Sequence, residues 1–443
     1  MLYGGEFNFK RSVLAVMLVA PLMGYGHAVQ SQALDEKKLE THTDIPSPGA
    51  ISENPPQAQR LAQLLMSSAP NYLVVDDFNH DGRVDLGFTS HGGNHSRLFL
   101  QLGSRQWQAG PEISEVGFHP GELISLSGED GNRRFLLFAE GENKIRVMTP
   151  TAEGGLKVDS EIKAIFPRAG TKFSWPGWGM GLAFAPFTKA MIVLVEDFLP
   201  DKATASSAHF LSFQPSFAKT QHVAAADLGG DGIDEILFMN PVTSQLMVIR
   251  YPCGEARPTI EELWTFKQAG PARFVIPADI DQDGDMDILV PGEAGQATTG
   301  ITALNILVKD NRGGWTQSAI PIPATTREEG GVPGLRGTAF GIDKDGRGYA
   351  LTAGYDRLSL VQIPFGWDGS EHAIRQMSFT KRQGIPAVAL KDLDEDGWLD
   401  AVLAGGMGDT NGGVILYGPL WESFTDLNGE DLVPSAGRGS SAH

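Results

Sequence analysis

The sequence has only one cysteine, Cys253, so no disulfide can form within the chain. A protein without disulfides depends on its hydrophobic core, or on another stabiliser such as bound metal ions. We interpret Cys253 as a buried structural thiol rather than a reactive one. Basic residues are also scarce, because 35 Lys and Arg stand against 54 Asp and Glu, a formal net charge of -19. This balance argues against nucleic acid as a partner, since a polyanion is bound through Lys and Arg.

Long hydrophobic runs are missing beyond the N-terminus. The run SVLAVMLVAPLMGY follows Lys10 and Arg11 and is too short to span a bilayer. A basic start followed by a short apolar run is typical of an export signal, with cleavage after Ala28 or Ala33. We predict a signal peptide at 1–28 and a mature protein that is secreted or periplasmic, in the cell envelope, with no transmembrane segment. An uncleaved N-terminal membrane anchor is the alternative.

Four short segments crowd aspartates before a glycine and an apolar strand. They read DFNHDGRVDLGF, DLGGDGIDEILF, DIDQDGDMDILV and DLDEDGWLDAVL, and they start at Asp77, Asp227, Asp279 and Asp392. Their glycines are separated by close to three, one and two units of about fifty residues. Two vacant slots hold the degraded copies LSGEDGNRRFLLFAEG and GIDKDGRGYALTAG, and a third, near residue 187, keeps only the strand–loop–strand pattern. The sequence therefore predicts seven units.

Helical periodicity is nearly absent from these units. Apolar and polar residues alternate in each one, with a turn signal about every 8–12 residues. Four strands per unit of about fifty residues, repeated seven times, are typical of a β-propeller. The predicted fold class is therefore all-β, a seven-bladed β-propeller in which Trp107, Trp264 and Trp315 pack the blades.

The propeller is expected to span residues 58–430. A flexible linker at 29–57 precedes it, because that segment is polar and contains prolines. A disordered tail at 431–443 follows it. The segment AQRLAQLLMS, which starts at Ala58, fits either a short helix or a strand that closes the ring.

The spacing of the acids points to metal. Acids at positions 1, 3 and 5 of each loop repel one another unless a cation lies among them. The glycine at position 6 permits a sharp turn, and the carbonyl of residue 7 and the acid at position 9 complete a cage of oxygens. Ca²⁺ takes about 6–8 oxygen ligands in flexible loops, and no His or Cys stands at the ligand positions. An EF-hand is excluded, because it needs glutamate at position 12, where these loops have Phe88, Phe238, Val290 and Leu403.

Acids at positions 1, 3, 5 and 9 followed at once by a strand resemble the FG-GAP (VCBS-type) repeat, the blade unit of the integrin α-subunit propeller. The resemblance covers residues 70–425 and implies about three Ca²⁺ sites and a weak or empty fourth. Two loops match at every position, with Asp279, Asp281, Asp283, Asp287 and the Asp285 carbonyl, and with Asp392, Asp394, Asp396, Asp400 and the Trp398 carbonyl. The first loop supplies Asp77, Asn79, Asp81, Asp85 and the Arg83 carbonyl. The remaining loop has Gly229 at position 3 and keeps Asp227, Asp231, Glu235 and the Ile233 carbonyl.

The sixth unit, around Asp343, has Gly341 at position 1 and Tyr349 at position 9, and we expect it to hold no ion. We interpret the metal sites as structural, because every carboxylate is used on the metal and no nucleophile or general base stands nearby. In a propeller of this type, the links between blades lie on the face opposite the metal loops. A protein or carbohydrate ligand, with an anionic one considered, is therefore expected on that opposite face, around the channel.

Cations and histidines are expected to mark the link face. The residues concerned are His119, Lys172, Lys219, His222, Lys267, Arg273, Arg327, Arg336, Lys381 and Arg382. The aromatic cluster Phe173, Trp175 and Trp178 is expected beside them. These features favour a calcium-binding interaction or adhesion module. The alternatives are a carbohydrate-active lyase or hydrolase that uses His91, His119 or a loop lysine at the channel mouth, and a scaffold subunit of an envelope complex. The sequence contains no GxSxG, HExxH, Walker or dinucleotide-binding motif.

Overall fold

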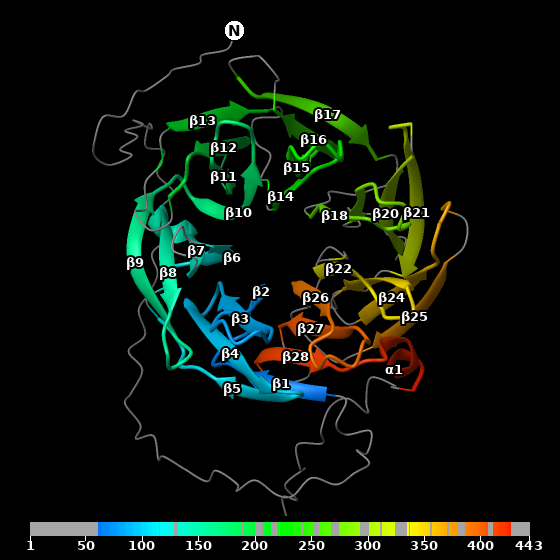
Figure 1. Ribbon diagram of the computed structural model, residues 1–443, viewed down its shortest axis with the longest axis horizontal. Helices are drawn as coiled ribbons and strands as arrows, with labels where there is room; N and C mark the ends of the chain where they lie inside the picture. The colour runs from blue at the N-terminus through cyan, green and yellow to red at the C-terminus, as the bar shows by residue number, and fades with distance from the viewer. Residues whose placement is uncertain are drawn as a thin grey trace, which may run out of the picture.

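The computed structural model describes residues 61–426 with internal gaps. The gaps are 115, 128–131, 188, 200–204, 206, 214–219, 221, 241, 252–256, 267–273, 293–300, 311, 324–334, 336, 355–356, 370–371, 379–385 and 406–410. The predicted signal peptide, linker, tail and the environment of Cys253 therefore lie outside the described residues. Seven four-stranded antiparallel sheets form a ring, which confirms the seven-bladed β-propeller (Figure 1).

Six of the blades are built from four consecutive strands each. The first three are β2 (Tyr72–Asp76), β3 (Asp85–Ser90), β4 (His95–Gly103) and β5 (Gln106–Ala109); β6 (Pro120–Ser127), β7 (Arg133–Ala139), β8 (Lys144–Pro150) and β9 (Leu156–Lys163); β10 (Pro167–Ser174), β11 (Met180–Pro186), β12 (Met191–Glu196) and β13 (Ser207–Ser212). The next three are β14 (Val223–Ala226), β15 (Glu235–Asn240), β16 (Gln245–Arg250) and β17 (Thr259–Thr265); β18 (Ile276–Ala278), β19 (Asp287–Pro291), β20 (Ile301–Lys309) and β21 (Trp315–Pro323); β22 (Gly337–Ile342), β23 (Gly348–Ala353), β24 (Arg357–Ile363) and β25 (Ala373–Ser378).

The seventh blade joins the two ends of the described chain. Its strands, in order, are β26 (Ala387–Lys391), β27 (Asp400–Ala404), β28 (Gly412–Leu416) and β1 (Leu61–Leu65). Leu61 pairs with Leu416 and Leu65 with Gly412, so residues Leu61–Leu65 of the segment that fitted either a helix or a strand form the ring-closing strand. A short helix, α1 (Leu420–Asp426), follows β28, and a 3₁₀ turn, η2 (Glu140–Glu142), connects β7 and β8 in the second blade.

The order of the strands decides which loops share a face. The first strand of each blade lies nearest the axis of the ring (Figure 1). Successive strands within a blade run antiparallel, so the loop after the first strand and the turn after the third lie on one face. We call it the acidic-loop face. The loops after the second strands and the links between blades lie on the other, which we call the link face.

The core is divided among the interfaces between blades. The described residues form seven hydrophobic clusters, one for each pair of neighbouring blades. Phe88 and Ile415, for example, pack the first blade against the seventh. Near the axis the backbones of neighbouring blades approach closely at Gly121, where a Cβ would lie 2.2 Å from the Arg168 carbonyl oxygen of the next blade. This close packing holds the first strands in a fixed ring around the channel.

Candidate metal loops and channel mouth

The four acidic loops, at 77–84, 227–234, 279–286 and 392–399, share one backbone shape. Positions 4 and 6 have positive φ, as at Gln282 (64°) and Gly284 (96°), which folds the chain back on itself. The carboxylate at position 1 accepts the N–H of position 6: Asp77 from Gly82 at 3.0 Å, Asp227 from Gly232 at 2.7 Å, Asp279 from Gly284 at 3.2 Å and Asp392 from Gly397 at 2.9 Å. The carboxylate at position 5 accepts the N–H of position 7: Asp81 from Arg83 at 2.9 Å, Asp231 from Ile233 at 3.0 Å, Asp283 from Asp285 at 2.9 Å and Asp396 from Trp398 at 2.8 Å.

The acid at position 9 is the first residue of the second strand, and it fastens the loop to its own blade. Asp400 accepts the backbone N–H of Leu393 at 2.8 Å on one oxygen and that of Gly418 at 2.7 Å on the other. Asp85 and Asp287 each make the same pair of bonds within their own blades. Burial raises the pKa of Asp400 to about 7 and that of Asp85 and Asp287 to about 6. These acids therefore have a structural role that the spacing alone did not reveal.

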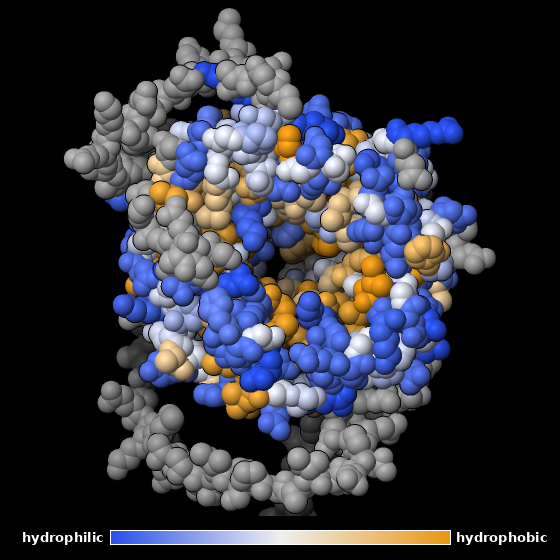
Figure 2. Space-filling model, in the orientation of Figure 1, coloured by the Kyte–Doolittle hydropathy of each residue, from blue (hydrophilic) through white to orange (hydrophobic). Residues whose placement is uncertain are grey.

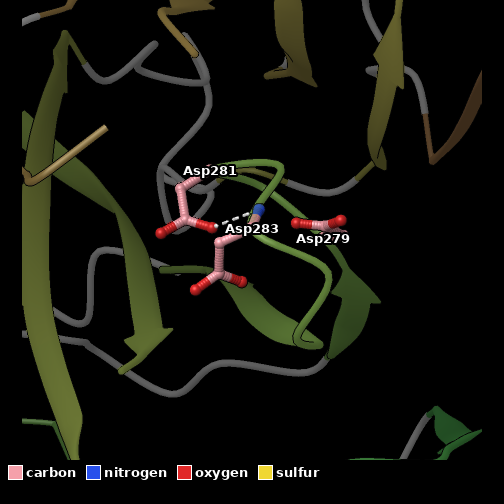
Figure 3. A group of neighbouring side chains, drawn as sticks. All are labelled: Asp279, Asp281 and Asp283. Atoms are coloured by element: carbon pink, nitrogen blue, oxygen red, sulfur yellow. Dashed lines mark hydrogen bonds between the residues drawn. The ribbon is translucent and has the colours of Figure 1, made fainter. Parts of the chain in front are cut away.

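In the Asp279 loop, three carboxylates converge. Asp279, Asp281 and Asp283 each place one oxygen within 4.8 Å of the others, and Figure 3 shows them around one side of the loop. Asp279 Oδ1 is buried and has no hydrogen-bond partner among the described residues. Burial, together with the charge of Asp283, raises the pKa of Asp281. The carboxylate oxygens of these three residues thus lie close together, and no described cation or hydrogen-bond donor neutralises all of them.

The Asp392 loop gathers oxygens of Asp392, Asp394 and Asp400 within the same 4.8 Å limit. The Asp394 side chain is only 2% exposed, and its Oδ1 has no partner among the described residues. Its other oxygen accepts a hydrogen bond from Arg105 Nε at 2.5 Å. Arg105 comes from the turn between β4 and β5 of the neighbouring blade, so no signal inside the repeat could have identified it.

The other two acidic loops offer weaker sets of ligands. In the Asp77 loop, the Asn79 side-chain amide donates to Asp81 Oδ2 at 3.2 Å, and Arg83 lies 3.2 Å from the same oxygen. The Asp227 loop has Gly229 in place of a third ligand. Within the described ranges, groups of three convergent acidic or histidine ligands occur only in the Asp279 and Asp392 loops.

The residues present fit a hard cation. The donors at positions 1, 3 and 5 are carboxylate or amide oxygens, which are the ligands that Ca²⁺ prefers. Buried carboxylate oxygens without partners are costly unless a cation or a donor compensates them. The unpartnered atoms of Asp279 and Asp394 lie in the two loops with the fullest ligand sets.

In the sixth blade, the loop after the first strand is a short turn that is held by hydrogen bonds to its own aspartate. Asp343 accepts the N–H groups of Asp345 and Arg347, both at 2.9 Å. Lys344 from this turn donates to the Asp396 carbonyl at 3.0 Å, and its ammonium lies 4.2 Å from the centre of the Trp398 ring. The sixth turn therefore braces the Asp392 loop of the next blade.

Two predictions for the third blade are wrong: the loop between its first two strands is not near residue 187, and the segment from Lys172 to Trp178 is not a link between blades. Residues 187–190 join the second and third strands, and the loop after the first strand is WPGWG at 175–179. The aromatic cluster Phe173, Trp175 and Trp178 therefore lies toward the acidic-loop face, and Lys172 lies in the inner strand β10 rather than in a link. The loop is shorter than the acidic ones and carries no acid, so the repeat spacing placed it incorrectly.

The aromatic cluster fills the space of the missing acidic loop by packing against the fourth blade. Trp175 and Trp178 have ring centres 4.9 Å apart, and Trp175 Nε1 donates to the Asp234 carbonyl at 2.6 Å. Trp175 is buried in the core between these two blades. These contacts give the cluster a packing role.

The link face brings together the two histidines considered for catalysis. His91 Nε2 lies 2.9 Å from His119 Nδ1, and His91 Nδ1 lies 3.0 Å from the Pro120 carbonyl oxygen. The Pro120 carbonyl oxygen can only accept a hydrogen bond, so His91 Nδ1 donates to it, and the Nε2 atom of neutral His91 accepts from His119 Nδ1. Seven of the predicted link-face cations lie outside the described residues: Lys219, Lys267, Arg273, Arg327, Arg336, Lys381 and Arg382.

A cavity of about 280 Å³ opens at the ends of the first strands on the link face. Residues from all seven blades line it, among them Tyr72, Glu122, Arg168, His222 and Phe274. Figure 2 views the ring from the opposite, acidic-loop face, where the channel is visibly hollowed at the centre. Sequence reasoning named His222 but missed the others. A signal existed, because Tyr72, His222 and Phe274 each stand five residues before position 1 of an acidic loop.

Burial at the channel mouth shifts the pKa values of the titratable side chains that line the cavity. Burial raises the pKa of Glu122 to about 8 and that of Tyr72 to about 12, and it lowers the pKa of His222 to about 4. Arg168 donates to Glu140 Oε2 at 3.0 Å, so its charge is compensated. At neutral pH the described wall of the cavity therefore carries little net charge.

Comparisons with known proteins support the fold and nothing finer. No protein-family model matches the chain, and no curated protein matches it. Among solved structures, hydrazine synthase from Kuenenia stuttgartiensis is similar, with 10% identity and a TM-score of 0.51, over 81% of this chain and 98% of that one. A proposed 6-phosphogluconolactonase from Bacteroides uniformis has 13% identity and a TM-score of 0.48, over 70% of this chain and 86% of that one. A Lactobacillus plantarum protein has 13% identity and a TM-score of 0.48, over 73% and 89%.

No helix in the described part of the chain has the length and apolar character to cross a membrane. Identities this low carry no information about activity or ligand. The ring of seven four-stranded sheets therefore shows that the chain has the β-propeller fold.

Proposed function

We propose that this protein is an exported, calcium-stabilised β-propeller that acts as a binding module, with structural metal on the acidic-loop face and its ligand on the link face. The observation that carries the metal part is the convergence of three carboxylates in each of the Asp279 and Asp392 loops, with a buried unpartnered oxygen in each. The acids at positions 1, 3, 5 and 9 and the carbonyl of residue 7 would hold each ion. Secretion or a periplasmic location rests on the predicted N-terminal export signal and stays a prediction.

Metal in these loops is proposed to stabilise rather than to catalyse. Each loop joins the first two strands of its blade, so an ion that neutralises the clustered acids strengthens the hairpin nearest the channel. Ca²⁺ that binds only the folded state at about 100 times its dissociation constant adds about 2.7 kcal/mol per site. We expect about three sites, at the Asp77, Asp279 and Asp392 loops, and a weak or empty one at Asp227.

The experiment compares two substitutions at loop position 5. Asp283→Asn removes a charged ligand from the Asp279 loop but keeps the oxygen that accepts the Asp285 N–H. Asp345→Asn makes the same change in the sixth blade, where Asp345 pairs with Arg347 at 2.9 Å. Calcium would be counted by elemental analysis after dialysis, and unfolding would be followed with and without chelator.

We expect the Asp283→Asn protein to lose about one Ca²⁺ and the Asp345→Asn protein to keep the wild-type content. Chelation should lower the melting temperature of the wild type more than that of Asp283→Asn. Wild-type protein without bound calcium, or with a melting curve that chelator leaves unchanged, would refute the metal part of the proposal.

The binding part rests on the geometry of the two faces. On the acidic-loop face the carboxylates are engaged with the loop backbone and with each other, and the aromatic cluster is packed against the next blade. On the link face, all seven blades contribute to one cavity with polar side chains in its wall. Small-molecule sites are usually concave and combine apolar walls with a few polar groups. The link face is therefore the better candidate for ligand binding.

A further inference from the structure

The cavity at the channel mouth has a polar side and an apolar side. Most of its polar groups come from the first four blades, with Tyr72, Glu122, Arg168 and His222 among them, and Thr338 adds a hydroxyl from the sixth blade. The fifth and seventh blades contribute apolar groups, among them Phe274 and Val388. A ligand that fits this cavity needs hydrogen-bonding groups along one edge and an apolar surface on the other.

The polar side offers both donors and acceptors. Glu122 Oε2 accepts the backbone N–H of Gly170 at 3.1 Å, which fixes the carboxyl and leaves its second oxygen for a ligand. Asn71 is held in the same way, because its side-chain oxygen accepts the N–H of His91 at 3.0 Å. The Tyr72 hydroxyl and the Arg168 guanidinium line the same cavity. Groups held by the backbone are preorganised, so they lose little freedom when a ligand binds.

The charge of the cavity argues against an anion. The cation Arg168 is paired with Glu140 at 3.0 Å, and the side chains of both are largely buried. Glu122 has a pKa of about 8 and is mostly protonated at neutral pH, while His222, with a pKa of about 4, is uncharged. An anionic ligand would find no uncompensated cation among the described residues of this wall. The volume of about 280 Å³ lies at the small end of ligand pockets and suits one ring rather than a polymer.

We propose that the channel mouth on the link face binds a neutral, polyhydroxylated ring of the size of one sugar residue. Its hydroxyl groups meet Tyr72, Glu122 and Arg168, and its apolar face lies against Phe274 and the neighbouring aliphatic side chains. This inference rests on the proposed link-face binding function and names its ligand class. Of the ligands that the sequence left open, this proposal selects a neutral carbohydrate ring over an anionic one.

The test uses saturation-transfer NMR and calorimetric titration of the calcium-loaded full chain. The probes are the neutral sugars glucose, galactose, mannose, xylose, fucose and rhamnose, with glucuronate as the matched anion, all at millimolar concentration. Tyr72→Phe removes one hydroxyl from the cavity. The matched control is Tyr251→Phe, because the Tyr251 hydroxyl donates to the Pro176 carbonyl at 3.0 Å on the acidic-loop face. Calcium content and melting temperature verify that both variants are folded.

We expect at least one neutral sugar to bind, and Tyr72→Phe to weaken it about tenfold, the loss of one hydrogen bond. Tyr251→Phe should bind as the wild type does, and glucuronate should bind no more tightly than glucose. The proposal is overturned if none of the neutral sugars binds, if glucuronate binds more tightly, or if both variants lose affinity equally. Calcium binding with no sugar binding would refute this inference and leave the metal part of the proposed function intact.

Discussion

Replacing Glu122 by glutamine should remove a pH dependence of stability that the channel imposes. Glu122 lies on β6, accepts the Gly170 N–H at 3.1 Å, and shares the cavity with Tyr72 and Arg168, the latter paired with Glu140. Burial raises its pKa from 4.5 to about 8, against the opposing effect of the Gly170 N–H. Glutamine keeps the shape and the acceptor oxygen but cannot ionise.

The sign follows from the protons bound in each state. The unfolded chain releases the Glu122 proton near pH 4.5, whereas the folded chain holds it up to about pH 8. Between these values the folded state binds more protons, so the free energy of unfolding falls as the pH rises. At about 1.4 kcal/mol per pKa unit, a shift from 4.5 to about 8 sets an upper limit of about 5 kcal/mol. Glu122 is only half-buried, and solvent screening reduces this limit, so we expect about 2–3 kcal/mol.

The assay is urea unfolding at a series of pH values with excess Ca²⁺, followed by tryptophan fluorescence. The Glu122→Gln protein should gain about 2–3 kcal/mol over the wild type between about pH 5 and about pH 8. Glu161→Gln is the control, because Lys144 and Arg146 lower the pKa of Glu161 and its ionisation is complete below this range. The reasoning would be refuted if the free energy of unfolding changed with pH in the same way in both proteins. It would also be refuted if the Glu122→Gln protein became less stable than the wild type as the pH rises.

Two packing predictions complete the set. Gly121→Ala should lower the free energy of unfolding by about 1–3 kcal/mol, because the new Cβ would lie 2.2 Å from the Arg168 carbonyl oxygen and force two inner strands apart. A stability equal to that of the wild type in urea unfolding would contradict this close approach. Phe88→Ala should cost about 3–5 kcal/mol, because Phe88 is fully buried between the first and seventh blades. The control Phe365→Ala changes a ring that is 73% exposed, so a similar loss in both variants would argue against the inter-blade core.

Much of the fold could be read from local patterns. The glycines of the four acidic loops lie at multiples of one repeat length, and each loop is followed by a fully buried second strand such as Asp85–Ser90. Both features depend on neighbours in the sequence, so seven blades and their acidic hairpins were predictable. The third blade was placed incorrectly, because its WPGWG loop has neither the acids nor the length of the others. Its Trp175 is held by the Asp234 carbonyl of the next blade, which sequence spacing does not encode.

The sequence by itself determined the identity and order of the candidate oxygen ligands, because positions 1, 3, 5 and 9 lie within one loop and a tight turn folds that loop back on itself. Only the tertiary structure decided what surrounds them and what lies across the channel. Arg105 reaches Asp394 from a neighbouring blade, and Leu61 pairs with Leu416 at the opposite end of the described chain. Tyr72, Glu122 and Arg168 share one cavity although they belong to three different blades. Closure of the ring sets these distances, since blades far apart in sequence become neighbours only when the first and last strands pair.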